Sequence, residues 1–168
     1  IQEFAQRTCD LSRTAGQQLH GFFECGQFVS VARAPGRLDV MGGIADYSGS
    51  LVLQLPIRQA ALVAAQRTDH DDWQIVSLPN CDDSPLRSVR LTKVDRAQLS
   101  NNESAQRWFR QDVSKAWAAY LAGVVVVLGQ ELGVNIDCGM RLLLQSDVPE
   151  AKGVSSSAAI EVAAMRAV

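Results

Sequence analysis

The sequence predicts an α+β domain, a mixed sheet packed by helices, and two observations carry the prediction. The first part of the chain consists mainly of β-branched or alternating segments separated by turn residues, a pattern typical of strands. The second part has a long segment with apolar residues at helical spacing, then one more strand and a helix rich in small residues. At 168 residues and 47% hydrophobic, the chain can bury one core.

Most of the predicted strands lie before residue 95. The first, residues 28–34, alternates, and Pro35-Gly36 is expected to stop it. The glycine-rich stretch that follows is predicted to be a loop. Residues 2–23, upstream of the first strand, are predicted to form a helix of mixed polarity. Further strands are predicted at residues 51–55, 60–66, 73–78 and 89–94.

Helices dominate the second part of the chain. Asn101, Asn102 and Ser104 offer N-caps for a long helix, and Gly133 is expected to end it. A strand is predicted at residues 140–145, ending in Ser146-Asp147-Val148-Pro149, and a helix of small residues that approaches its neighbours closely is predicted from Ser155. The apolar stripe that should pack the long helix on the sheet comprises Trp117, Tyr120, Leu121, Val124, Val125 and Leu128.

Charge and composition exclude several classes of protein. With 16 basic and 18 acidic residues the net charge is -2, which excludes a polybasic nucleic-acid binder, and no nucleic acid is expected as a partner. The apolar run at residues 116–129 is shorter than the ~18 residues of a membrane span, so it is predicted to be a core helix without a membrane partner. The absence of C-x-x-C spacing argues against a zinc or redox motif for Cys9, Cys25, Cys81 and Cys138.

The ends of the chain carry two further expectations. The sequence does not open with a basic segment followed by an apolar stretch, the pattern of a secretory signal peptide, so a cytoplasmic location is expected. The chain begins at Ile1 and stops at Val168 within a helical pattern. We therefore expect a fragment of a longer polypeptide.

Residues 149–159, PEAKGVSSSAA, form the sharpest local signal. A strand end is followed by a glycine turn and then by hydroxyl side chains that open a helix. Such a helix start has unpaired N–H groups and the positive end of the helix dipole, so it attracts phosphate. Alternatively, the serines simply cap the helix without a ligand. A Walker loop is excluded, because Lys152 precedes its glycine.

A second segment, residues 34–50, carries Arg37, Asp39 and Asp46 on what is predicted to be a loop leaving a strand. An arginine can hold a transferring phosphoryl group, and a carboxylate can fix sugar hydroxyls. Alternatively, Arg37 and Asp46 pair on a loop surface. Residues 69–72, Asp-His-Asp-Asp, are predicted to form a solvated hairpin loop rather than a metal site.

Together, the two segments resemble the galactokinase, homoserine kinase, mevalonate kinase and phosphomevalonate kinase superfamily, the GHMP kinases. APGRLDVMGGIADYSGS, residues 34–50, is similar to their sugar-kinase motif, and VPEAKGVSSSAAIEVA, residues 148–163, is similar to their phosphate-binding motif. Within the superfamily, these segments and KAWAAYLAGVVVVLGQELGV, residues 115–134, are similar to the kinase domain of plant-type L-arabinokinases.

The resemblance implies a ribosomal-protein-S5-domain-2-like N-terminal domain at residues 27–168, truncated, with residues 1–26 as a leading helical segment. The family's second α+β domain, with its catalytic aspartate and third glycine-rich motif, would follow residue 168 and pack on this chain. The 168 residues alone are therefore expected to be inactive and to expose an apolar face.

The resemblance also implies a role for each motif residue, with ATP and Mg²⁺ as cofactors. Arg37 would be catalytic, assisting deprotonation of the anomeric hydroxyl or stabilising the transferring phosphoryl group. Ser157 would also bind Mg²⁺. The residues implied to bind the sugar are Asp39, Gly43, Ile44, Asp46 and Tyr47, and those implied to bind the ATP phosphates are Lys152, Gly153, Val154, Ser155, Ser156, Ser157 and Ala158.

One departure from galactokinases suggests the substrate. Where they carry a Glu-His pair that helps to hold the hydroxymethyl end of a hexose, this chain has Gly43 and Ile44. An apolar site leaves a hydroxyl unpaired, so a sugar without that arm, L-arabinose, is expected for an ATP-dependent sugar 1-kinase. The alternatives are a galactokinase or uronic-acid 1-kinase and, in another class, a pseudokinase that senses sugar and ATP without turnover.

Overall fold

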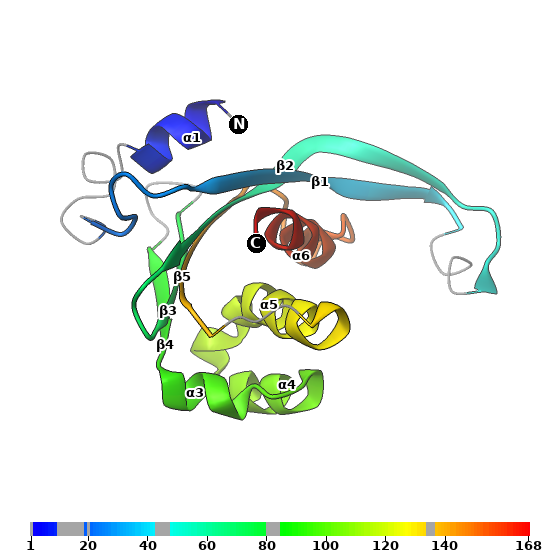
Figure 1. The fold of residues 1–168 in the computed structure, drawn as a ribbon. Helices are drawn as coiled ribbons and strands as arrows, with labels where there is room; N and C mark the ends of the chain where they lie inside the picture. The colour runs from blue at the N-terminus through cyan, green and yellow to red at the C-terminus, as the bar shows by residue number, and fades with distance from the viewer. Residues whose placement is uncertain (1, 10–18, 20, 43–47, 80–84, 134–136) are drawn as a thin grey trace.

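A computed structural model describes residues 2–9, 19, 21–42, 48–79, 85–133 and 137–168 (Figure 1). Its centre is a five-stranded sheet in the order β1-β2-β5-β3-β4. Neighbouring strands are antiparallel except for the parallel pair β3 and β5, so the predicted mixed sheet is confirmed. The strands are β1 (Ser30–Met41), β2 (Leu53–Thr68), β3 (Trp73–Ser77), β4 (Arg87–Leu91) and β5 (Gly139–Ser146).

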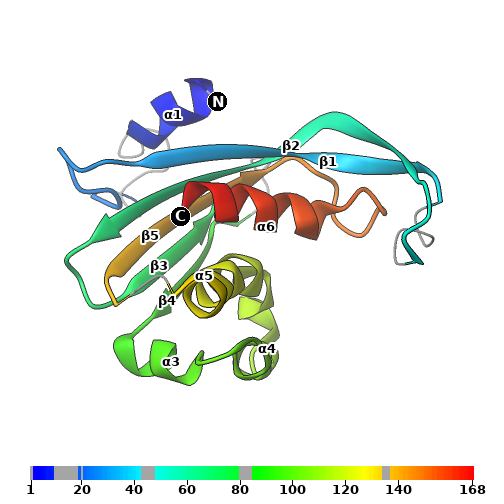
Figure 2. The same cartoon turned by 45° about the vertical axis from the view of Figure 1, so that its right-hand side comes forward.

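Helices cover both faces of the sheet unequally. α5 and α6 lie on one face with α3 and α4 outside α5, whereas α1 lies on the opposite face (Figures 1 and 2). This arrangement confirms the predicted α+β class. The described helices are α1 (Gln2–Cys9), α3 (Lys93–Gln98), α4 (Asn102–Arg110), the 3₁₀ helix η3 (Val113–Ala118), α5 (Ala119–Leu132) and α6 (Ser156–Ala167).

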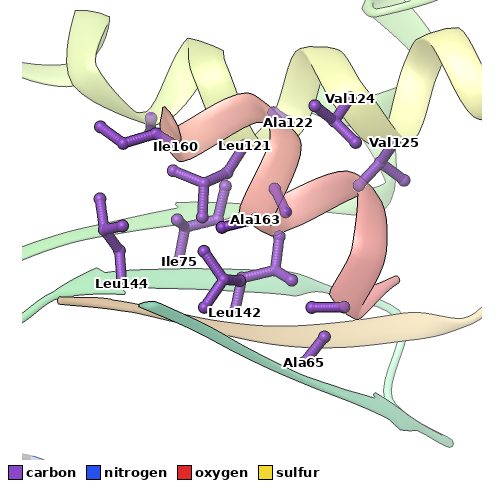
Figure 3. Packing of buried hydrophobic residues seen from close by; sticks show 14 of the residues in the cluster. Ala65, Ile75, Leu121, Ala122, Val124, Val125, Leu142, Leu144, Ile160 and Ala163 are labelled. Atoms are coloured by element: carbon purple, nitrogen blue, oxygen red, sulfur yellow. The ribbon is translucent and has the colours of Figure 1, made fainter. Parts of the chain in front are cut away.

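The main core lies between the sheet and the helices α5 and α6. In Figure 3, Leu121 and Val125 of α5 and Ala163 of α6 lie above Ile75 and Leu142 of the sheet. Small residues on α6 allow this close approach, as predicted. A smaller cluster on the other face packs the leading segment on the sheet through Phe4, Leu19, Phe22, Ala64, Val76 and Leu143.

The predicted stop at Pro35-Gly36 is wrong, because β1 continues to Met41. Pro35 lies on the edge strand of the sheet and next to a register shift, the two places where a strand tolerates a missing N–H. Consequently, Arg37 and Asp39 lie on a strand and not on the predicted loop. The two strands predicted at residues 51–55 and 60–66 are likewise one continuous strand, β2.

Helix boundaries also differ from the prediction. The strand predicted at residues 89–94 ends at Leu91, because Thr92 and Asp95 form a capping box that starts α3. The segment predicted to be one long helix is divided into two, because α4 ends at Arg110 and Asp112 caps a second helical stretch that begins at Val113. Of the leading helix predicted at residues 2–23, Gln2–Cys9 form α1, whereas residues 21–23 are not helical and residues 10–18 lie outside the described residues. Asn101 caps α4, and Gly133, with φ of 62°, ends α5, as predicted.

Val113–Leu132 is the one helical stretch of the described residues that is long and apolar enough to cross a membrane. Its residues Leu121, Ala122 and Val125 are fully buried against the sheet and α6. One face of this stretch is thus buried in the main core, as in a helix packed on a sheet, which agrees with the role that the sequence predicted.

The connection between β2 and β3 passes over the start of β5. Residues 69–72 join two strands that are separated in the sheet by β5, so the predicted hairpin is wrong. Gly139, the first residue of β5, lies under this connection. A Cβ atom at Gly139 would lie 2.6 Å from Thr68 Oγ1 and would overlap the carbonyl oxygen of His70. Only glycine therefore fits at this crossing.

Asp72 holds the crossing in place. Its carboxylate accepts hydrogen bonds from Arg141 Nη2 at 3.2 Å and Arg90 Nε at 2.7 Å. The side chains of Asp72 and Arg141 are only 11% and 10% exposed. Burial by itself would raise the pKa of Asp72, but the two guanidinium groups outweigh it and hold the pKa below its usual value. Asp72 is thus a buried structural anion rather than a solvated loop residue.

Replacing Asp72 by asparagine is expected to destabilise the fold by about 3 kcal/mol at pH 7, because Arg141 keeps a buried charge without a counter-ion. A carboxyl group whose pKa is lowered by folding stabilises above its unfolded pKa of about 4, and the contribution disappears as the pH falls through the folded value. The difference between wild type and Asp72→Asn should therefore shrink below about pH 4. Urea unfolding at pH 7 and below about pH 4 measures this difference in stability. Asp71→Asn, at an exposed aspartate, is the charge-matched control. Equal midpoints for all three proteins would contradict the assignment.

Candidate functional site

The strand β1 and the loop before α6, residues 149–155, lie side by side. We name this loop the serine loop. Because β1 is an edge strand, its outer backbone groups are open to other partners, and the N–H of Arg37 donates a hydrogen bond to the carbonyl oxygen of Val154 at 2.9 Å. The two segments that the sequence singled out, more than a hundred residues apart, are thus in direct contact.

Gly36 makes this contact possible. A Cβ atom there would lie 2.8 Å from Val148 Cγ1 and 3.0 Å from both Ile57 Cδ1 and the Val154 carbonyl oxygen. A side chain would therefore push the serine loop away from β1. This close approach is the physical reason for a glycine inside a strand.

The backbone of the serine loop is strained. Ala151 and Ser155 have φ angles of 55° and 58°, in the left-handed region that costs a non-glycine residue on the order of 1 kcal/mol, and Gly153 has φ of 70°. Ser155 is the N-cap of α6, but its side chain makes no capping hydrogen bond. Within the described residues, no side chain caps the N–H groups of the first turn, which lie at the positive end of a 12-residue helix. This geometry suits an anion.

The base of the serine loop is fixed to β2 by Asp147, a residue to which the sequence analysis gave no role. Its Oδ1 accepts a hydrogen bond from the N–H of Ala60 at 2.6 Å, and its own N–H donates to the Ala60 carbonyl at 3.3 Å. The available sequence signal was a polar residue at the end of a predicted strand. Asp147 thereby sets where the loop leaves the sheet.

Arg37 and Asp39 form an ion pair on the same strand, with 3.5 Å between Arg37 Nε and Asp39 Oδ1. Both side chains are partly exposed, at 43% and 35%. The guanidinium group of Arg37 is therefore still partly accessible to a ligand, and the backbone of the same residue contacts the serine loop. The pairing with Asp46 that the sequence left open lies outside the described residues.

Two family models match these two segments. The model described as the GHMP kinases N terminal domain matches residues 119–168, which contain α5, β5, the serine loop and α6. The model described as the galactokinase galactose-binding signature matches residues 23–67, which contain β1 and nearly all of β2. The chain belongs to the GHMP kinases.

Curated relatives agree with this assignment to the GHMP kinases. An L-arabinokinase of Arabidopsis thaliana is 46% identical over 88% of this chain, and a galactokinase of Roseiflexus sp. is 36% identical over 79%. The chain spans 17% and 29% of those relatives' lengths.

Solved structures of GHMP kinases share the fold. Lactococcus lactis galactokinase, solved in complex with galactose, matches 90% of this chain with a TM-score of 0.63 at 22% identity, and the match spans 35% of that structure. Methanococcus jannaschii mevalonate kinase matches 87% with a TM-score of 0.61 at 16% identity, spanning 40% of that structure. The predicted N-terminal GHMP kinase fold is therefore confirmed.

The structure brings together only part of the site implied by the GHMP kinase motifs. Arg37 and Asp39 lie on β1, whereas Gly43, Ile44, Asp46 and Tyr47 lie outside the described residues. In the serine loop and the first turn of α6, Lys152 and Gly153 are exposed, and the half-buried positions are Val154, Ser155, Ser156, Ser157 and Ala158.

The described part of the chain contains no group of three or more His, Cys, Asp or Glu side chains arranged to hold a metal ion. At residues 69–72, Asp72 is engaged by two arginines. Any metal at the serine loop would thus take its remaining ligands from an anion, from water or from other parts of the protein.

Proposed function

We propose that the protein containing this chain is an ATP-dependent sugar 1-kinase. The observation that carries the proposal is the hydrogen bond from the Arg37 N–H to the Val154 carbonyl, because it sets the strand of the sugar motif beside the serine loop. A sugar held by the first and an ATP γ-phosphate held by the second would lie within reach of each other. Phosphoryl transfer depends mainly on such positioning and on charge stabilisation.

The start of α6, Arg37 and Ser157 can each be given a part in the phosphoryl transfer. The N–H groups at the start of α6 would bind the ATP phosphates, and Arg37 would stabilise the charge on the γ-phosphoryl group as its bond to the leaving oxygen breaks. The anomeric oxygen forms the new bond, and its proton passes to a base outside this chain. The half-buried Ser157 offers a hard oxygen ligand that fits Mg²⁺, which keeps phosphate oxygens and water as its other ligands.

The sugar we propose is L-arabinose. Two observations support it: the 46% identity to a protein named L-arabinokinase, and Gly43-Ile44 where galactokinases carry Glu-His. An apolar position gives the C6 hydroxyl of galactose no partner, which lowers its affinity relative to a sugar that lacks C6. Galactose is the second candidate, because the first part of the chain matches a galactose-binding signature.

We also propose that a second kinase domain packs on the outer half of the β1–β2 hairpin, residues 37–41 and 51–56. This half extends past α6 (Figure 2). Its two strands carry an extended exposed apolar surface, and burial of such a surface against another protein domain is favoured over its exposure to water. Its exposed apolar side chains, 44–99% exposed, are Leu38, Val40, Met41, Leu51, Leu53 and Leu55.

The test is ADP release by the complete polypeptide with Mg-ATP and L-arabinose, D-galactose or D-galacturonate supplied separately. Faster release with L-arabinose is expected. Faster release with galactose or galacturonate would leave a sugar kinase but overturn the substrate. No release with any sugar, together with retained ATP and sugar binding, would favour the sensing pseudokinase.

Gly36→Ala is expected to raise KM for ATP about 10-fold, because the new methyl group displaces the serine loop from β1. The same substitution at Gly123, where a Cβ meets nothing within 4 Å, is the control and should leave KM unchanged. Steady-state kinetics of the complete polypeptide measure both. Equal KM values for the two variants would show that the close packing at Gly36 does not position the loop.

A further inference from the structure

Two side-chain nitrogens in the outer half of the β1–β2 hairpin are shielded from solvent and make no hydrogen bond within the described part of the chain. Gln54 Nε2 is one, and the other is Arg37 Nε, which has only the 3.5 Å ion pair with Asp39 Oδ1. A buried N–H group without an acceptor costs free energy, so native proteins rarely retain one without a reason. An acceptor that arrives with a ligand would supply that reason here.

The strand register places the two nitrogens on one surface. Gln54 lies directly opposite Asp39 in the β1–β2 pair, so their side chains leave the same face of the hairpin. Arg37, two residues before Asp39, shares that face, and the 3.5 Å ion pair between them agrees with this placement. We name these three residues the Arg37–Asp39–Gln54 cluster.

The burial pattern of β2 is inverted at this point. Leu53 and Leu55 are each 55% exposed, whereas the amide nitrogen of Gln54 between them is shielded. A strand that buries a glutamine amide and exposes its leucines is not arranged for the stability of this domain alone. The pattern points to a polar ligand on the glutamine side.

The cluster has the chemistry of a hydroxyl-binding site. A hydroxyl group both accepts and donates one hydrogen bond, and here the Gln54 carboxamide can donate while the Asp39 carboxylate accepts. The guanidinium of Arg37 adds a donor for a neighbouring oxygen. A sugar, with hydroxyls on adjacent carbons, matches this set of groups.

We propose that Gln54 is a further sugar-binding residue, whose Nε2 donates a hydrogen bond to a hydroxyl of the sugar that also donates to Asp39. The inference rests on the proposed sugar kinase function and adds a specificity contact on the second strand of the hairpin. It also assigns the unpartnered amide a role that packing does not provide.

The test compares Gln54→Leu with Gln59→Leu in the complete polypeptide. Leucine keeps the approximate size of glutamine but cannot hydrogen bond, and Gln59 is a half-buried glutamine on the same strand. Gln54→Leu should raise KM for the sugar about 5- to 10-fold, the loss of one hydrogen bond, and leave KM for ATP unchanged. The melting temperature should not fall, because leucine removes a shielded amide that has no hydrogen-bond partner in the described structure. Gln59→Leu should change none of these values.

A second measurement separates contact from structure. With a series of monodeoxy L-arabinoses, one analogue should be used equally well by wild type and Gln54→Leu, because it lacks the hydroxyl that Gln54 binds. An unchanged sugar KM in Gln54→Leu, equal rises in both KM values, or the same loss with every analogue would overturn the inference. If the wild-type polypeptide phosphorylates no sugar, the proposed sugar kinase function itself is wrong. The wild-type assay alone shows this outcome, so it is distinguished from a failure of the Gln54 inference.

Discussion

Gly139→Ala should abolish the native fold or destabilise it by at least about 3 kcal/mol. The added Cβ would overlap the His70 carbonyl and approach Thr68 Oγ1, and neither the backbone carbonyl nor the short threonine side chain can swing away. To make room, the connection over β5 would have to lift, breaking the hydrogen bond from the Met140 N–H to the Asp72 carbonyl. Soluble yield and urea unfolding measure the effect.

Gly123→Ala, in the middle of α5, is the matched control. A Cβ there meets no heavy atom within 4 Å, and alanine is favoured over glycine in a helix by about 1 kcal/mol. The same chemical change should therefore stabilise at one position and destabilise strongly at the other. Similar midpoints for the two variants would refute the account of the crossing.

Arg37→Ala in the complete polypeptide is expected to lower kcat about 10²- to 10³-fold, the usual effect of removing a group that stabilises transition-state charge. KM for the sugar and for ATP should change much less. Arg37→Lys should recover only part of the rate, because an ammonium keeps the charge but not the planar fork of donors.

Arg33→Ala is the control for that experiment. Arg33 is on the same strand and carries the same charge, but its Nη2 donates to the Arg58 carbonyl away from the serine loop. Its loss should leave kcat within about twofold, since it is not at the transferring group. If both variants lose activity equally, the effect comes from strand stability rather than from transition-state charge.

Local patterns predicted the elements whose own residues determine them. The buried stripe residues Leu121, Val124 and Val125 of α5, the small residues of α6 and the glycine before the serines needed only neighbouring sequence. Tyr120, predicted in the same stripe, is 41% exposed. The continuation of β1 through Pro35-Gly36 did not follow from neighbouring residues. It depends on β1 being an edge strand and on the serine loop lying against it, which are properties of the assembled sheet.

The candidate site could be predicted from the sequence only in part. The motifs indicated Arg37 and the serine loop, which the structure places in contact, but no pattern around Gln54, the residue proposed above to bind the sugar, distinguishes it from a surface glutamine. Its place opposite Asp39 is set by a register shift in β1 and β2 that the amino-acid order does not display. Asp72 was misassigned for a related reason, since its partners Arg90 and Arg141 come from two other strands.

Because β5 lies between β2 and β3, the sheet stays incomplete during synthesis until β5 has left the ribosome. Ser77 ends β3 and Gly139 begins β5, 62 positions later, which translation at 5–20 residues per second covers in about 3–12 s. During that interval, the inner edges of β2 and β3 have no strand to pair with and can pair with other chains. Nascent chains that stop before residue 139 should therefore aggregate or bind chaperones more strongly than chains that include β5.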